Sequence, residues 1–211
     1  MVKPAYVKKI DRLLKEHFGP VKPPLDYSTN EQLAIAVILS AQCTDERVNL
    51  VTPALFAKYP DMFSLAKAKL QDIEKLIFST GFYHNKAKNI LALAKILTEQ
   101  YAGKIPADFE VLTKLPGIGR KTANVIMNLA FDQAPGIVVD THVRRISQRL
   151  GFTTATTPET VEKALMKVWP KEVWIDLSLY MIFLGRKWCM ARKPNCEDCI
   201  LTKICPKLPA N

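Results

Sequence analysis

The sequence has no long hydrophobic run, and this absence excludes several classes of protein. Its longest apolar stretch, Leu33–Leu39, has 7 residues, whereas a membrane-spanning helix needs about 20. Hydrophobic residues still make up 48% of the 211 residues and charged residues 24%, as in folded globular proteins. The first 18 residues mix lysines with acids, which is typical of neither a signal peptide nor a transit peptide. We therefore expect a cytoplasmic protein without membrane association.

Strand patterns are almost absent as well. The only strand-like run, Ile137–Val139, is too short to carry a sheet. Signals for helix starts recur along the chain instead, at Pro4, Thr29, Thr44 and Thr157. The sequence predicts an all-α fold of about nine or ten helices.

Acidic residues are too few to balance the basic ones. The chain has 20 Asp and Glu against 30 Lys and Arg, which gives a net charge of +10 and a pI near 9.4. Such a balance favours a polyanionic partner, with nucleic acid first and an acidic membrane surface second.

Glycine is also scarce, with 8 residues, yet Gly117 and Gly119 lie two positions apart. They predict a tight turn between a short helix at 108–114 and a longer one at 120–131. Their N–H groups and the following helix start, which includes Arg120, can bind a DNA phosphate. A dinucleotide fingerprint would need glycine at position 122, and a P-loop would need it at position 120. A plain corner between two helices remains the alternative.

Lys121 lies in the first turn of the predicted longer helix, where the helix dipole disfavours a cation. The dipole thereby favours the free amine, which is the nucleophilic form. The alternative is an ordinary surface lysine. Asp140 follows an apolar run and precedes a helix, so it is a good N-cap, and a half-buried cap carboxylate can also act in a cleft. His142 is interpreted as a local hydrogen-bonding partner rather than a catalytic base.

Cysteine is rare, but four of the five cysteines form the pattern C-x6-C-x2-C-x5-C, at Cys189, Cys196, Cys199 and Cys205. Four thiolates this close can hold one metal centre, and chemistry alone leaves zinc and iron–sulfur open. The single C-x2-C pair favours iron–sulfur. Arg192 and Lys193, between the first two cysteines, are candidates for a second phosphate contact. The fifth, Cys43, is expected to be a buried small residue.

Three segments together resemble one known family. Leu115–Ala123, Val138–Arg145 and the cysteine spacing are similar to those of the endonuclease III family of helix–hairpin–helix DNA glycosylases, and the similarity begins at Leu33. The resemblance implies one [4Fe–4S] cluster held by the four cysteines. It also implies that the protein removes oxidised pyrimidines from double-stranded DNA. By the same resemblance, Lys121 forms a Schiff base and Asp140 stabilises the developing positive charge. β-Elimination then cuts the abasic strand on the 3′ side. We expect a bacterial-type protein that is a monomer and associates with the nucleoid through DNA binding.

The resemblance further implies two helical domains. Residues 25–134 would form a six-helix domain with the hairpin, and residues 1–24 with 135–211 would form the iron–sulfur cluster domain. The damaged nucleotide would flip into a DNA-binding cleft between them. Gln42 and Phe82 match loops that fill the gap left by a flipped base, although Phe82 is alternatively a core aromatic residue.

Two other functions remain open. The first is a non-enzymatic, metal-clipped DNA-binding protein that uses the same hairpin. The second is an adenine-mismatch glycosylase, but such relatives lack the lysine and carry a Glu where this chain has Ala36.

Overall fold

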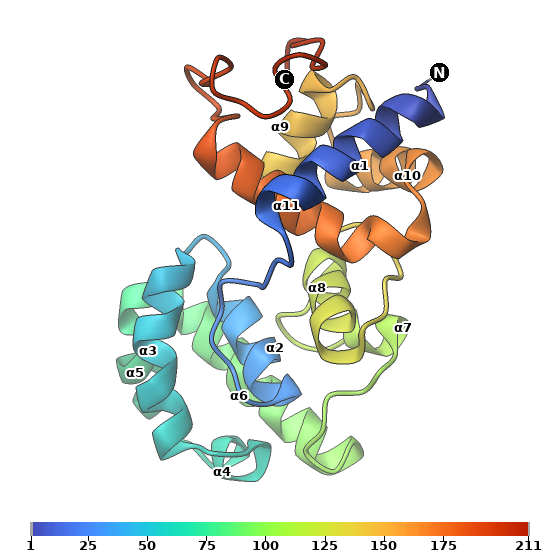
Figure 1. Ribbon diagram of the computed structural model, residues 1–211. Coiled ribbons are helices and arrows are strands. Elements are labelled where there is room, and N and C mark those ends of the chain that lie inside the picture. Colours follow the sequence, from blue (N-terminus) through green and yellow to red (C-terminus); the bar gives the residue numbers. More distant parts are fainter. Residues whose placement is uncertain (1, 211) are drawn as a thin grey trace. The chain divides into compact units, whose positions relative to one another are not determined.

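The computed structural model describes residues 2–210, and every regular element in them is a helix (Figure 1). These residues form eleven α-helices and two short 3-10 helices, so the all-α prediction is confirmed, with slightly more helices than expected. Ile137–Val139 is a buried irregular segment. No helix in the described range has the length and hydropathy that crossing a membrane requires. The chain divides into two compact units, Pro24–Pro135 and Met1–Pro23 with Gly136–Asn211.

The unit of residues 24–135 holds seven α-helices, of which α6 packs against α4 and α5, and α2 packs against α3 and α8 (Figure 1). Asp61 and Ser64 form a capping box that starts the five-residue α4. The helices are α2 (Asn30–Leu39), α3 (Asp45–Lys58), α4 (Met62–Ala66), α5 (Leu70–Ile77), α6 (Tyr83–Gln100), α7 (Phe109–Leu112) and α8 (Arg120–Phe131), with a 3-10 helix, η1, at Phe78–Thr80.

Helix α2 is the centre of this unit's core. All seven residues from Leu33 to Leu39 are buried, so this helix is apolar on every side rather than amphipathic. Thr29 caps it by accepting a hydrogen bond from the Gln32 N–H at 3.2 Å. The Gln32 carboxamide oxygen accepts a hydrogen bond from the Ser28 N–H at 2.9 Å. In a capping box it would accept from the N–H of Thr29 instead.

The other unit holds α1 (Pro4–Phe18), α9 (Thr141–Arg149), α10 (Pro158–Val168), η2 (Lys171–Val173) and α11 (Trp174–Lys187). Two tyrosines connect the N-terminal segment to the rest of this unit. Tyr180 donates a hydrogen bond to the Gly19 carbonyl at 2.9 Å, and Tyr6 donates one to the Leu150 carbonyl at 3.2 Å. Burial, with a smaller effect of Cys205, raises the pKa of Tyr6 to about 12, so its hydroxyl remains a donor at neutral pH.

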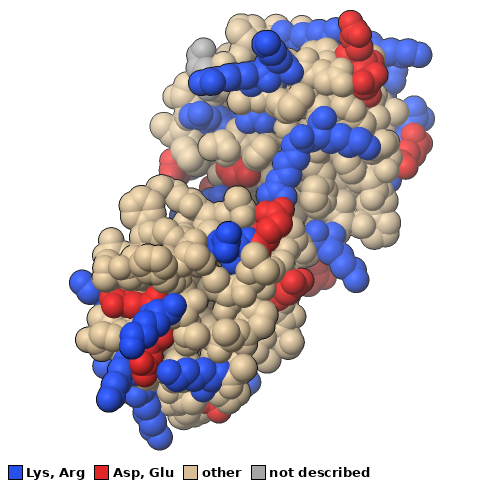
Figure 2. Space-filling model, turned by 90° about the vertical axis from the view of Figure 1, so that its left-hand side faces the viewer, with Lys and Arg blue, Asp and Glu red and all other residues tan. Residues whose placement is uncertain are grey.

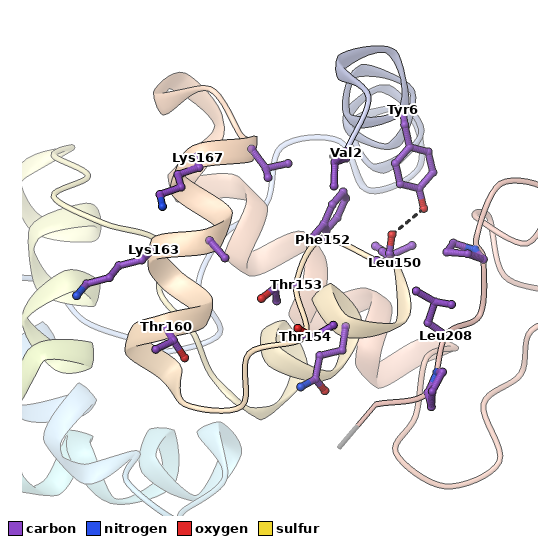
Figure 3. A pocket seen from close by; sticks show the side chains of 16 residues that line it. Val2, Tyr6, Leu150, Phe152, Thr153, Thr154, Thr160, Lys163, Lys167 and Leu208 are labelled. Carbon is purple, nitrogen blue, oxygen red and sulfur yellow. Dashed lines mark hydrogen bonds between the residues drawn. The ribbon is translucent and has the colours of Figure 1, made fainter.

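A hollow of about 980 Å³ lies within this second unit (Figure 3). Tyr6, Phe152 and Leu208 contribute apolar surface to it, and Lys163 and Lys167 of α10 also line it. None of the residues that the sequence singled out for catalysis or DNA contact lines this hollow. The candidate functional residues therefore lie elsewhere in each unit.

Candidate DNA-binding and catalytic site

The two glycines of the hairpin differ in backbone conformation and in the space around them. Gly117 has φ +77°, a conformation that strains any residue with a side chain, and a Cβ there would make a tight contact of 3.0 Å with the Asn89 Cβ. Gly119 has an ordinary φ of −84° and open space where a Cβ would be. Between them Ile118 is 3% exposed and holds the turn against the core, as the sequence predicts.

The hairpin presents unused N–H groups. Gly119 is the N-cap of α8 and has no side chain to cap it, so the first-turn donors of α8 lack a side-chain acceptor at that position. Within residues 2–210, neither Gly117 nor Gly119 donates a backbone hydrogen bond. Donors and dipole at this helix start together suit an anion such as a phosphate. The exposed Arg120 guanidinium lies 5.2 Å from the Phe109 ring centroid and thereby connects α7 to α8.

Lys121 occupies the first turn of α8, as the sequence predicts, and its side chain is exposed. Its amine makes no hydrogen bond or ion pair to any described residue. The amine is therefore available to a ligand that binds at the start of α8.

Asp140 is the N-cap of α9, which confirms its predicted structural role. Its Oδ1 accepts a hydrogen bond from the Val143 N–H at 2.8 Å, and the side chain is half-buried. The second oxygen, Oδ2, accepts no hydrogen bond in the described part of the chain. The cap therefore uses only one of the two carboxylate oxygens.

The backbone around Asp140 is held on both sides. Ser178 of α11 donates to the Val138 carbonyl at 3.0 Å, which fixes the segment that leads to Asp140. His142 Nδ1 lies 3.0 Å from an Arg145 guanidinium nitrogen, so His142 has the local hydrogen-bonding role that we predicted.

Two arginines of α9 hold the segment that begins at Cys189. Arg145 donates two hydrogen bonds to the Cys189 carbonyl, at 3.0 and 2.9 Å. Arg149 donates to the Met190 carbonyl at 2.7 Å and to the Ala191 carbonyl at 3.1 Å. Sequence reasoning missed this clamp, although the spacing of four residues places both arginines on one face of a helix.

The four cysteines are partly buried, and hydrogen-bond donors lie beside the sulfurs of Cys189 and Cys205. Arg149 Nη1 lies 3.2 Å from Cys189 Sγ, and the Lys207 N–H donates to Cys205 Sγ at 3.4 Å. Burial, and secondarily the neighbouring thiols, raise the pKa of Cys199 and Cys205. A positively charged centre would offset the repulsion between thiolates.

No three His, Cys, Asp or Glu side chains of residues 2–210 lie close enough together to hold a single metal ion. Four soft sulfur donors with N–H groups directed at sulfur nevertheless fit an iron–sulfur cluster. Arg192 and Lys193 are exposed on the segment between the first two cysteines, where Lys193 has φ +49°. Figure 2 shows Lys and Arg side chains spread over the drawn face, with Asp and Glu among them.

Gln42 and Phe82 share an uncommon backbone conformation. Their φ angles are +52° and +49°, and such left-handed non-glycine residues cost about 1 kcal/mol or more. Phe82 is 63% exposed, so the interpretation of Phe82 as a core aromatic is wrong. Both side chains are exposed at turns, Gln42 after α2 and Phe82 before α6.

Comparisons with known proteins agree on one family. Residues 35–171 match the model of the HhH-GPD superfamily of base excision DNA repair proteins, and residues 189–205 match the iron-sulfur binding domain of endonuclease III. The four cysteines thus belong to an iron–sulfur binding domain, and the protein carries one [4Fe–4S] cluster.

Individual relatives cover almost the whole chain. The chain is 50% identical over 199 residues to endonuclease III of Synechocystis sp., covering 94% of this chain and 91% of the relative. It is 41% identical over 192 residues to that of Escherichia coli, covering 91% and 90%. A solved structure of a trapped covalent endonuclease III–DNA intermediate matches with a TM-score of 0.91 and 42% identity, covering 98% of this chain and 97% of that one. The chain therefore belongs to the endonuclease III family of bifunctional DNA glycosylases and abasic-site lyases of base excision repair.

Proposed function

We propose that this protein removes oxidised pyrimidines from double-stranded DNA and cuts the resulting abasic strand, with Lys121 as the nucleophile. The observation that carries this proposal is the exposed, unpartnered amine of Lys121 in the first turn of α8. It lies two residues after Gly119, whose N–H is unused and suits a DNA phosphate. A backbone bound there would bring a nucleotide within reach of the amine.

The reaction needs only an amine and proton transfers. The neutral amine attacks C1′, and the C1′–N bond breaks, with its electron pair leaving on the base, which takes up a proton. Loss of the nitrogen's protons and opening of the C1′–O4′ bond, with a proton going to O4′, give the Schiff base. Removal of a proton from C2′ then allows the C3′–O bond to break, with its electron pair leaving on the 3′ phosphate.

Asp140 would stabilise the positive charge that develops at C1′ and help to move the lysine proton. Because Oδ1 is used by the cap of α9, we assign this role to Oδ2. A carboxylate held at fixed geometry stabilises a developing charge without reorganising.

The remaining candidates would position the DNA. Gly117, Gly119 and Arg120 would bind one phosphate, and Arg192 with Lys193 would bind another. Gln42 and Phe82 would fill the gap left by the flipped nucleotide. We also infer that the protein acts on nucleoid DNA in the cytoplasm, since the relatives compared above are bacterial proteins, and that it acts as a monomer.

The test is borohydride trapping of the wild-type protein. Incubation with a duplex that contains one thymine glycol should give a stable adduct of protein and DNA strand, because borohydride reduces an imine to an amine. An undamaged duplex of the same sequence should give none. The non-enzymatic alternative predicts binding without any adduct, so absence of the adduct on both duplexes would favour it.

The cluster makes a separate prediction, because excision itself has no redox step and we assign the cluster a structural role. The purified protein should contain about four irons per chain, and Cys196→Ser should lose them together with much of its DNA affinity. Without the cluster, the segment with Arg192 and Lys193 keeps its contacts to Arg145 and Arg149 and the hydrogen bond from the Asn195 N–H to the Trp188 carbonyl, but it loses the anchor at Cys196. Iron analysis and duplex titration measure both effects, and one zinc per chain in the wild type would overturn the assignment.

A further inference from the structure

Lys86 of α6 is a buried lysine that the mechanism above does not use. It is 5% exposed, and its Nζ donates to the Leu39 carbonyl at 2.7 Å and to the Thr80 carbonyl at 2.8 Å. No carboxylate pairs with it anywhere in residues 2–210. Burying a charged amine without a counter-ion is costly, so this placement calls for a reason beyond stability.

The two acceptors are the last residues of two helices. Leu39 ends α2, and Thr80 ends the 3-10 helix η1. Carbonyls at helix C-termini carry partial negative charge and lack partners within the helix. The lysine supplies both the missing donors and a compensating charge, while burial lowers its pKa.

These helix ends lead directly to the two left-handed residues. Gln42 follows Leu39 by three positions, and Phe82 follows Thr80 by two. Lys86 therefore joins the bases of both turns, one through each hydrogen bond. Strained left-handed residues persist where the surrounding structure over-determines them, and Lys86 provides such a constraint for both at once.

We propose that Lys86 is a positioning residue that holds the turns of Gln42 and Phe82 at a fixed spacing, so that both side chains enter damaged DNA together. The inference rests on the proposed function, because it assumes that these two side chains contact the DNA. Lys86 itself contacts no DNA and is not a catalytic residue. Its effect should therefore be confined to duplexes that contain a gap to fill.

The experiment compares Lys86→Met with Lys88→Met. Both substitutions replace one lysine of α6 with an apolar side chain of similar length. Lys86 is buried, whereas Lys88 is exposed. Each variant, first shown to be folded by circular dichroism, is titrated with an undamaged duplex and with one containing a tetrahydrofuran abasic analogue opposite 2-aminopurine. Lys86→Met should bind the analogue duplex about tenfold more weakly, which corresponds to about 1.4 kcal/mol. Its affinity for undamaged duplex should match that of Lys88→Met.

A second readout reports insertion directly. The fluorescence change of 2-aminopurine at saturating protein should be reduced in Lys86→Met and unchanged in Lys88→Met. In a double-mutant cycle, Lys86→Met should add little to the loss caused by Phe82→Ala, because both remove the same inserted contact. Should Lys86→Met fail to fold, Lys86→Gln retains one amide donor and should give a smaller loss of the same kind.

Three results would overturn the inference: equal affinities of Lys86→Met and Lys88→Met for the analogue duplex, additive losses in the cycle, or an equal loss on undamaged DNA. Failure of the proposed function looks different. In that case the wild-type protein would itself fail to distinguish the two duplexes and would form no trapped adduct on damaged DNA.

Discussion

Lys121→Gln is expected to bind a thymine glycol duplex normally and to form no borohydride-trapped adduct, since a carboxamide cannot form an imine. Base release through this route should stop as well. The substitution keeps most of the side-chain length and removes a cation from the N-terminus of α8, where the dipole disfavours it. Thermal unfolding should therefore show equal stability or a gain of about 0.3–1 kcal/mol.

The matched control is Lys114→Gln, because Lys114 is an exposed lysine of the same hairpin that lies before Gly117. It should trap at the wild-type rate. An adduct formed by Lys121→Gln at that rate would show that another amine is the nucleophile and that the assignment of Lys121 is wrong.

Asp140→Asn is expected to slow base release by about 10²-fold while leaving folding and binding intact. The asparagine oxygen can still accept from the Val143 N–H, so the cap of α9 survives. The lost charge can no longer stabilise the cationic transition state, and removal of one fixed electrostatic contact of this kind costs about 10²–10³ in rate. Single-turnover release from a thymine glycol duplex measures this effect separately from binding.

Asp108→Asn supplies the control for this second variant. Asp108 caps α7 in the same way, with Oδ1 accepting from the Val111 N–H at 2.9 Å, but it is exposed and has no assigned role in the chemistry. Its single-turnover rate should equal that of the wild type. If Asp140→Asn releases the base as fast as Asp108→Asn, Asp140 acts only as the N-cap of α9 and its assignment to catalysis is wrong.

The helix boundaries were predictable wherever a local signal determines them. Thr29, Thr44 and Thr157 each cap the helix that the sequence predicts after them, because a cap depends only on a side chain and the next three N–H groups. The start of α8 at Arg120 and the buried Ile118 follow from the spacing of two glycines in the same local way.

Features that depend on distant segments were not predictable. Whether Phe82 is exposed depends on the direction of the turn before α6 relative to the core. An aromatic residue next to a glycine is compatible with either a buried or an exposed side chain. Lys86 continues the buried stripe of Ile90 and Leu97 on α6, so the sequence holds a clue that a lysine faces the core. The sequence gives no clue to its acceptors, because Leu39 lies 47 residues away.

The first turns of α6 combine two fixed points in a short length of helix. Asn89 packs closely against Gly117, and Lys86, three residues earlier, donates hydrogen bonds to the ends of α2 and η1. One inserted residue between them would rotate one point by about 100° relative to the other and lengthen the segment by about 1.5 Å. Insertions and deletions should therefore be tolerated in the turns around α4 but not between positions 86 and 89, where one inserted residue would change the position of the Gly117–Gly119 hairpin relative to the turns of Gln42 and Phe82.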